Sequence, residues 1–160
     1  MLPLSPGVLL GIGLGGFVDG IVLHQILQWH HMLTSAGYPA DSVRNLTINT
    51  LFDGLFHALT WIATAAGLVI LHRAVRLGFT WSGRRLLGGM AIGWGGFNLV
   101  EGTVNHHILG LHHVKESAAN PLLWDLGFLA LGMALVFIGV ALARQAGRQT
   151  ASARSVRRAA

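Results

Sequence analysis

The chain has 160 residues, of which 52% are apolar and only 11% are charged, a composition that excludes an ordinary soluble domain and indicates a membrane protein. It contains no cysteine, so disulfides, thiolate metal sites and iron–sulfur clusters are excluded. The net charge of +5 comes from eleven Lys and Arg residues. In a membrane protein such residues set the topology, so we expect a lipid bilayer and no nucleic acid as partner.

One stretch of thirteen residues occurs twice, at positions 19–31 and 101–113. Seven of the thirteen positions are identical, and an eighth keeps a carboxylate, Asp19 in the first copy and Glu101 in the second. The shared pattern is an acid, a glycine, three further residues, a histidine and a terminal His-His pair. This similarity indicates an internal duplication, and a repeat determines how the rest of the fold is interpreted.

The first expected helix covers about residues 7–31. Its apolar stretch exceeds the ~20 residues that a transmembrane helix needs. Glycines spaced four apart within it, such as Gly11 and Gly15, would let another helix approach closely. The stretch lacks a basic leader and a small-residue cleavage site, so we expect a retained helix rather than a cleaved signal peptide.

The second expected helix covers about residues 45–71, after a loop rich in Gly, Pro and Ser at 34–42. Polar residues recur in it every three or four positions and so form one stripe on an apolar helix. This stripe should face the interior of a helix bundle, and its members are Asn49, Asp53, His57, Thr60 and Thr64.

The third and fourth expected helices cover about residues 86–111 and 121–143. The third repeats the glycine-rich start of the first, and the fourth should begin at Pro121 after the N-cap Asn120. The fourth also resembles the second around Asp53 and Asp125. Residues 1–143 are therefore predicted to form an all-α integral membrane four-helix bundle of two duplicated hairpins, with pseudo-two-fold symmetry about the membrane normal.

Residues 144–160 form an Arg-rich tail that we expect to be disordered or to lie on the lipid surface. The tail and the connection between helices two and three carry nine of the eleven basic residues. The positive-inside rule then places both termini in the cytoplasm of a bacterial inner membrane, and the His-His ends of helices one and three outside.

Helical rise brings several ionisable side chains to one depth in the outer half of the bilayer. The core of a predicted metal site contains His24, Asp53, His57, His106 and Asp125. Three further residues would support this core, namely Asp19, Glu101 and His107. If both helices continue to their His-His ends, the remaining histidines would form an access site or an outer metal site, and these are His30, His31, His112 and His113.

Imidazole and carboxylate ligands suit transition metals such as Cu, Fe or Zn. Asp19 and Glu101 could orient ligand imidazoles, and four-helix bundles commonly bind metals between facing helices. Two other interpretations of the buried polar set are a haem held by opposing histidines and a polar core that conducts protons or ions.

The duplicated Asp-Gly and His-rich segments resemble an uncharacterised bacterial family of small predicted membrane proteins, classed as a domain of unknown function. The resemblance covers the chain before the tail and implies four spans, but no activity. The segment His107-x4-His112-His113 is similar to the histidine boxes of membrane desaturases and hydroxylases. Likewise, Asp53-x3-His57 is similar to the intramembrane ligand pair of copper membrane monooxygenases. Both likenesses suggest ligand types only.

These features predict an inner-membrane metalloprotein that binds one or two transition-metal ions, with redox or oxygen-dependent chemistry. A redox role would need a quinol or an electron-donor protein, because the chain has little room for a soluble electron-entry domain. One alternative is transport or delivery of a metal ion or protons. Another is an accessory subunit in a larger membrane complex or a homo-oligomer.

Overall fold

The computed structural model describes the backbone of residues 1–159 and the side chains of residues 1–149. Over these residues the secondary structure consists of helices joined by loops, with no strand. The helix α1 (Ser5–Phe17) continues directly into the π-helical segment η1 (Val18–Ile26). The long helix α2 (Val43–Arg76) follows, and α3 (Gly83–Glu101) continues into a second π-helical segment, η2 (Gly102–Ile108). The last helix is α4 (Pro121–Ala159).

Local sequence explains where the helices begin. The Ser42 hydroxyl accepts a hydrogen bond from the backbone of Asn45 at the start of α2, and Ser82 does the same for Arg85 at the start of α3. Each serine thereby satisfies a backbone donor that has no partner within the helix. The helix α4 starts at Pro121, whose missing N–H costs nothing at a first helical position.

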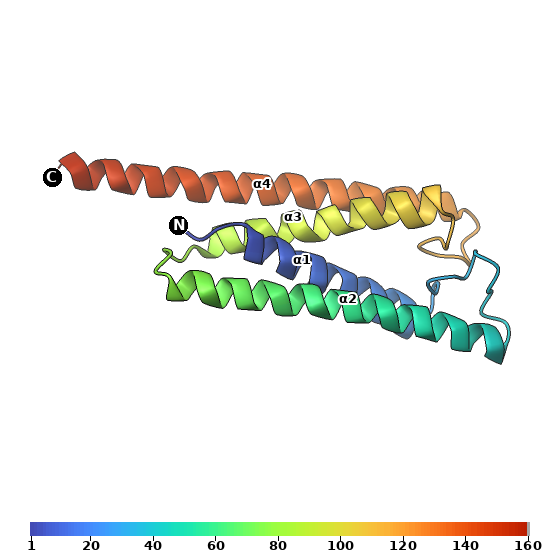
Figure 1. The fold of residues 1–160 in the computed structure, drawn as a ribbon. Coiled ribbons are helices and arrows are strands. Elements are labelled where there is room, and N and C mark those ends of the chain that lie inside the picture. The colour runs from blue at the N-terminus through green and yellow to red at the C-terminus, as the bar shows by residue number, and fades with distance from the viewer. Residues whose placement is uncertain (160) are drawn as a thin grey trace.

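The four helical segments lie side by side in the order α2, α1, α3, α4 (Figure 1). In the described part of the chain α1 packs on α2 and α3, α3 packs on α4, and α2 does not contact α4. The arrangement is therefore an open row. Along the helix axes, the N-terminus, the described end of α4 and the connection 77–82 lie at one end of the molecule. The connections 27–42 and 109–120 lie at the other end (Figure 1).

Glycines build the central contact between α1 and α3. A Cβ on Gly7 or on Gly89 would lie 3.0 Å from the Cα of the other glycine. A Cβ on Gly11 would collide with the Met90 carbonyl, and one on Gly93 would collide with the Val8 carbonyl. Only glycine permits backbones to approach this closely, as in other membrane helix pairs.

The first and third helices end earlier than the sequence predicted. The segments η1 and η2 stop at Ile26 and Ile108, and two residues later the backbone turns through positive φ, +49° at Gln28 and +57° at Gly110. Left-handed backbone of this kind cannot continue a helix. The His-His pairs at 30–31 and 112–113 consequently lie in loops, and side-chain directions inferred from a continuous helix do not apply to them.

The last helix extends further than predicted. It does not end near Ala143 but continues through Arg144 and Arg148 to Ala159, so the Arg-rich segment is helical over 144–159. Ala, Arg and Gln, which are abundant there, are good helix formers and explain the extension. The predicted placement of Arg154, Arg157 and Arg158 at the lipid surface concerns side chains beyond the described residues 1–149.

Within the described residues, three helical segments are long and apolar enough to cross a membrane, namely Ser5–Ile26, Val43–Arg76 and Pro121–Gln149. The continuous segment formed by α3 and η2 is not among them, because it is rich in glycine and polar residues such as Asn98 and Glu101. It lies between α1 and α4, so its neighbours cover much of its surface (Figure 1). The protein is thus an all-helical membrane protein.

Candidate metal centre

The carboxylate of Asp53 on α2 holds two imidazoles from the first repeat. His24 Nδ1 donates to Oδ1 at 2.9 Å, and His31 Nδ1 donates to Oδ2 at 2.7 Å. The backbone N–H of Met32 also donates to Oδ1, at 2.9 Å. Asp53 is 1% exposed, so these bonds are protected from water. Because each ring is bound to Asp53 through Nδ1, its Nε2 atom points away from this carboxylate.

Asp125 on α4 plays the same part for the second repeat. Its Oδ2 accepts from His113 Nδ1 at 2.6 Å, and its Oδ1 accepts from the backbone N–H of Val114 at 2.9 Å. His106 Nδ1 lies 3.4 Å from Oδ1. His31 corresponds to His113 at the 82-residue offset of the repeat, so the two carboxylates hold equivalent residues.

His30 and His112 cross over between the repeats. His30 Nδ1 donates to the Val114 carbonyl at 2.8 Å, and His112 Nδ1 donates to the Met32 carbonyl at 3.0 Å. Met32 and Val114 are themselves equivalent positions of the repeat. The two imidazole rings stack with centroids 4.5 Å apart and an interplanar angle of 8°. Both side chains are buried, at 2% and 0% exposure.

The loops 27–42 and 109–120, which carry these histidines, are hydrogen-bonded to each other. The backbone N–H of Ser35 donates to the Leu111 carbonyl at 2.9 Å, and that of Glu116 donates to the Trp29 carbonyl at 3.1 Å. The Ser35 hydroxyl also donates to the Glu116 carboxylate at 2.6 Å. The Lys115 ammonium lies 4.8 Å from the ring centroid of Trp29 and 4.9 Å from that of Trp124. These contacts hold the loop histidines in place.

The acidic residues that open each repeat contact histidines of the same cluster. Asp19 Oδ2 is 3.3 Å from His24 Nε2. Glu101 approaches two rings, with Oε2 3.2 Å from His106 Nε2 and Oε1 2.9 Å from His112 Nε2. All of these side chains are buried, so their charges can be compensated only by one another or by a bound cation.

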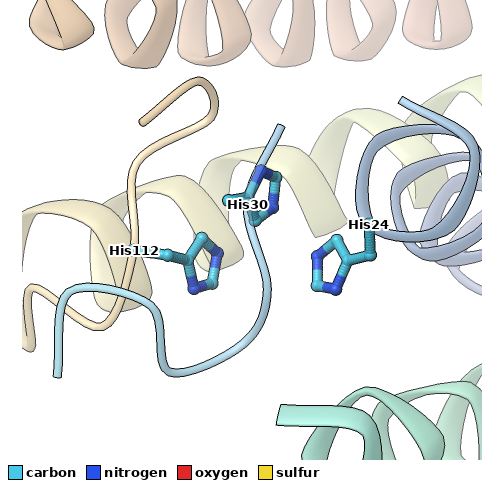
Figure 2. A group of neighbouring side chains, drawn as sticks. All are labelled: His24, His30 and His112. Carbon is cyan, nitrogen blue, oxygen red and sulfur yellow. The ribbon is translucent and has the colours of Figure 1, made fainter. Parts of the chain in front are cut away.

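Donor atoms of these residues converge in two overlapping groups. His24, His30 and His112 form one group, and Glu101, His106 and His112 form the other. Within each group the ligand atoms lie within 4.8 Å of one another. Figure 2 shows the three rings of the first group turned toward one another, His24 from η1 and the other two from the loops. Either group could hold a metal ion.

Several buried nitrogen atoms lack a hydrogen-bond partner among the described residues, and they point to what the cluster binds. They include Nε2 of His30, and also Nε2 of His24 and of His106, which have a carboxylate oxygen at 3.3 and 3.2 Å but form no hydrogen bond with it. Because Nδ1 of His30 donates to a carbonyl, its Nε2 carries a lone pair. Burial, followed by the neighbouring imidazoles of His112 and His24, lowers the pKa of His30 to about 2 and keeps this ring neutral. A buried imidazole lone pair without a partner fits a metal ligand.

Two residues of the predicted set lie apart from both groups. His57 is half-buried and packs on Gly20 and Phe17, and its Nε2 has no partner within the described residues. His107 is exposed. Conversely, His30 and His112, which the sequence placed in an outer site, lie at the centre. The difference arises because the helices end before these residues and the loops fold back over the core.

Two residues outside the predicted set, Thr34 and Glu116, shape the loops. The backbone N–H of His31 donates to the Thr34 hydroxyl at 2.7 Å, and that of His113 donates to the Glu116 carboxylate at 3.0 Å. Thr34 and Glu116 again differ by 82 positions. Extending the repeat three residues beyond its His-His pair would have drawn attention to both.

Comparison with known proteins gives the chain a family. No curated protein and no solved structure matches it. Residues 6–146 match a family described as predicted membrane protein (DUF2243). The matched range includes every residue of the cluster and the loops 27–42 and 109–120. The chain therefore belongs to this family of membrane proteins, DUF2243.

Proposed function

We propose that the protein is a membrane metalloprotein whose buried cluster binds one or two transition-metal ions. The observation that carries this proposal is the convergence of three buried imidazoles, those of His24, His30 and His112, with ligand atoms within 4.8 Å of one another. A tetrahedral ion with bonds of 2.0–2.1 Å spaces its ligands by about 3.4 Å, so small side-chain shifts would close the site. The proposed ligands are the members of the two groups, His24, His30, Glu101, His106 and His112. Asp19 lies beside them, 3.3 Å from His24 Nε2, and could complete the set.

Asp53 and Asp125 would not bind the ion directly. They accept hydrogen bonds from Nδ1 of His24, His31 and His113, the arrangement by which carboxylates orient imidazoles around metals. His31 and His113 would then form the outer edge of the site, since the His113 side chain is 39% exposed.

The ligand chemistry favours Fe, Cu or Zn, and of these a buried resident Fe or Cu ion suits redox or oxygen-dependent chemistry. Haem is disfavoured by geometry. An iron porphyrin would lie between two opposing imidazoles, whereas the rings of His30 and His112 stack directly with centroids 4.5 Å apart. This separation leaves no room for a macrocycle between them.

Two duplicated hairpins would form the scaffold. Contacts matched by the repeat offset support this, including the crossed bonds of His30 and His112 and the reciprocal collisions at Gly11 and Gly93. The pseudo-two-fold axis would run along the membrane normal through the α1–α3 contact. The α3–η2 segment would be a fourth span, its polar residues tolerated because α1 and α4 flank it.

Transport of an ion through the protein is supported less well. An ion that moves from the cluster along the helix axes to the opposite end of the molecule would have to pass the α1–α3 contact. There the backbones meet at Gly11 and Gly93, and a Cβ on either glycine would collide with a carbonyl of the partner helix. A resident metal agrees better with this closed packing.

Metal analysis of the detergent-purified protein tests the proposal. After growth with added Fe, Cu and Zn, the natural chain should contain about one or two equivalents of a single metal, and X-ray absorption should show imidazole scattering. The double variant His30→Ala with His112→Ala should retain less than about 0.2 equivalents, because ligand loss abolishes binding.

Two histidine variants serve as matched controls. His57→Leu introduces the residue found at position 129, which aligns with position 57 when Asp125 is aligned with Asp53. His72→Ala alters an exposed histidine at the far end of α2. Both should retain the metal. A natural chain without metal, or a double variant that keeps its metal, would rule out the proposed site.

A further inference from the structure

An apolar groove runs along α3 and ends at the metal cluster. It has a volume of about 570 Å³ and lies between α1, Phe56 of α2, and the α3–η2 segment. Its lining extends from Ile92 to Asn105, which corresponds to roughly 20 Å of helix. The polar side chains that line it, Glu101 and Asn105, lie together at the cluster end. An elongated apolar molecule with one polar head would match this shape.

Charge at the polar end restricts the head group. Glu101 is buried, is 6% exposed, and directs both oxygens toward histidines of the cluster. No Lys or Arg is among the described residues that line the groove, so none would pair with the carboxylate of a fatty acid or the phosphate of a phospholipid. The Asn105 amide donates to Glu101 Oε1 at 3.3 Å. The pair offers an acceptor and a donor, which suits an uncharged head that carries hydroxyl or carbonyl oxygens.

Aromatic residues beside the polar end favour a flat head. The rings of Phe56 and Phe97, both lining the groove, lie 5.9 Å apart at 31°. Phe56 also stacks on the imidazole of His24, with centroids 5.8 Å apart. A planar ring bound against this pair would be separated from the metal cluster by a single aromatic side chain.

We infer that this groove binds an isoprenoid quinone or quinol, with its ring beside Phe56 and Phe97 and its tail along α3 toward Ile92. Asn105 would donate to a quinone carbonyl, and Glu101 would accept from a quinol hydroxyl. The inference rests on the proposed function, because a quinol dissolved in the bilayer would serve as the redox partner of the proposed metal centre.

Photolabelling in phosphatidylcholine nanodiscs tests the groove directly. An azido-quinone with a decyl tail should label peptides that contain Phe56 or residues 92–105. Excess decyl-ubiquinone should suppress this labelling, whereas 1-decanol and decanoate should not. Labelling spread evenly over all helices, or equal suppression by 1-decanol or decanoate, would overturn the inference.

A pair of glycine variants makes the test specific. A Cβ on Gly96, which lines the groove, meets nothing within 4 Å, so Gly96→Leu should fill the groove without disturbing helix packing. Gly127 on α4 is equally open and lines a separate groove. Gly96→Leu should reduce labelling at least tenfold, and Gly127→Leu should leave it unchanged. Unchanged labelling in Gly96→Leu would contradict the quinone site.

Metal content measured on the same samples separates the two proposals. Protein that contains metal but is not labelled in the groove would refute the quinone site alone. Labelled protein without metal would refute the metal centre and leave the groove as a lipid-quinone site. Gly96→Leu should keep its metal, because Gly96 contacts none of the ligands.

Discussion

A carboxylate that bonds two imidazoles controls how those imidazoles point. Asp53 accepts from both His24 and His31 and from the Met32 backbone, so one side chain positions a buried imidazole, which is a proposed metal ligand, and the loop that carries His30. Partners of this kind typically contribute 10- to 100-fold, that is, about one to two orders of magnitude, to metal affinity.

Asp53→Asn should therefore weaken metal binding by about 10- to 100-fold without abolishing it, because an amide keeps one acceptor and nearly the same shape. Competition with a chelator of known affinity measures the change. Asp41→Asn makes the same chemical change at an exposed loop position and should have no effect. Equal affinities for Asp53→Asn and the natural chain would show that Asp53 does not orient the ligands.

The sequence indicated which residues lie in the cluster better than it indicated the position of each residue within it. Buried acids and histidines in a duplicated pattern identified most members of the cluster. The roles of His30 and His112 could not be predicted, because they depend on loops that fold back across the repeat and bond to Met32 and Val114. His57 shares a helix face with Asp53 but packs on Gly20, and helical periodicity alone does not show which neighbour a residue meets.

The helices owe their close approach to individual glycines. At Gly93 an added Cβ would collide with the Val8 carbonyl, which belongs to backbone and cannot move aside. At Gly96, three residues later on the same helix, an added Cβ meets nothing within 4 Å. The same substitution should thus have opposite consequences at the two positions.

Gly93→Ala should destabilise the protein by about 1–3 kcal/mol, the usual cost of overpacking. Gly96→Ala should be neutral or stabilise it by up to about 1 kcal/mol, since alanine is the better helix former. Equilibrium unfolding in mixed micelles, followed by helical circular dichroism, compares the two. A loss of stability in Gly96→Ala as large as that in Gly93→Ala would mean that the α1–α3 contact is not the source of the effect.

Helix positions followed from apolar length, but helix ends did not. Residues 27–31 contain neither a proline nor a glycine that would stop the preceding helix. The chain instead turns at Gln28 with positive φ, and it turns at Gly110 in the second copy. Glycine marks this turn in only one of the two repeats, so propensity could reveal it only through the alignment of both copies.

Along the helix axes, the ionisable cluster lies at one end of the molecule and most Lys and Arg residues lie at the other. Arg73, Arg76, Arg84 and Arg85 lie near the connection between α2 and α3, at the end where both termini lie (Figure 1). Arg44 and Lys115 are the basic residues on the side of the cluster. Loops rich in Lys and Arg remain in the cytoplasm, so the cluster should face the outside of the membrane.

Single cysteines can report this orientation cleanly because the natural chain has none. Ala40→Cys and Ser117→Cys place exposed thiols in the two loops over the cluster, and Thr80→Cys places one in the basic connection. In intact spheroplasts a membrane-impermeant maleimide should label positions 40 and 117, and it should label position 80 only after permeabilisation. Labelling of position 80 alone in intact cells would invert the topology and place the metal centre toward the cytoplasm. Labelling of all three positions in intact spheroplasts would contradict the single span α2 between the loops and the basic connection. The cysteine-free natural chain, which should stay unlabelled, is the control for non-specific labelling.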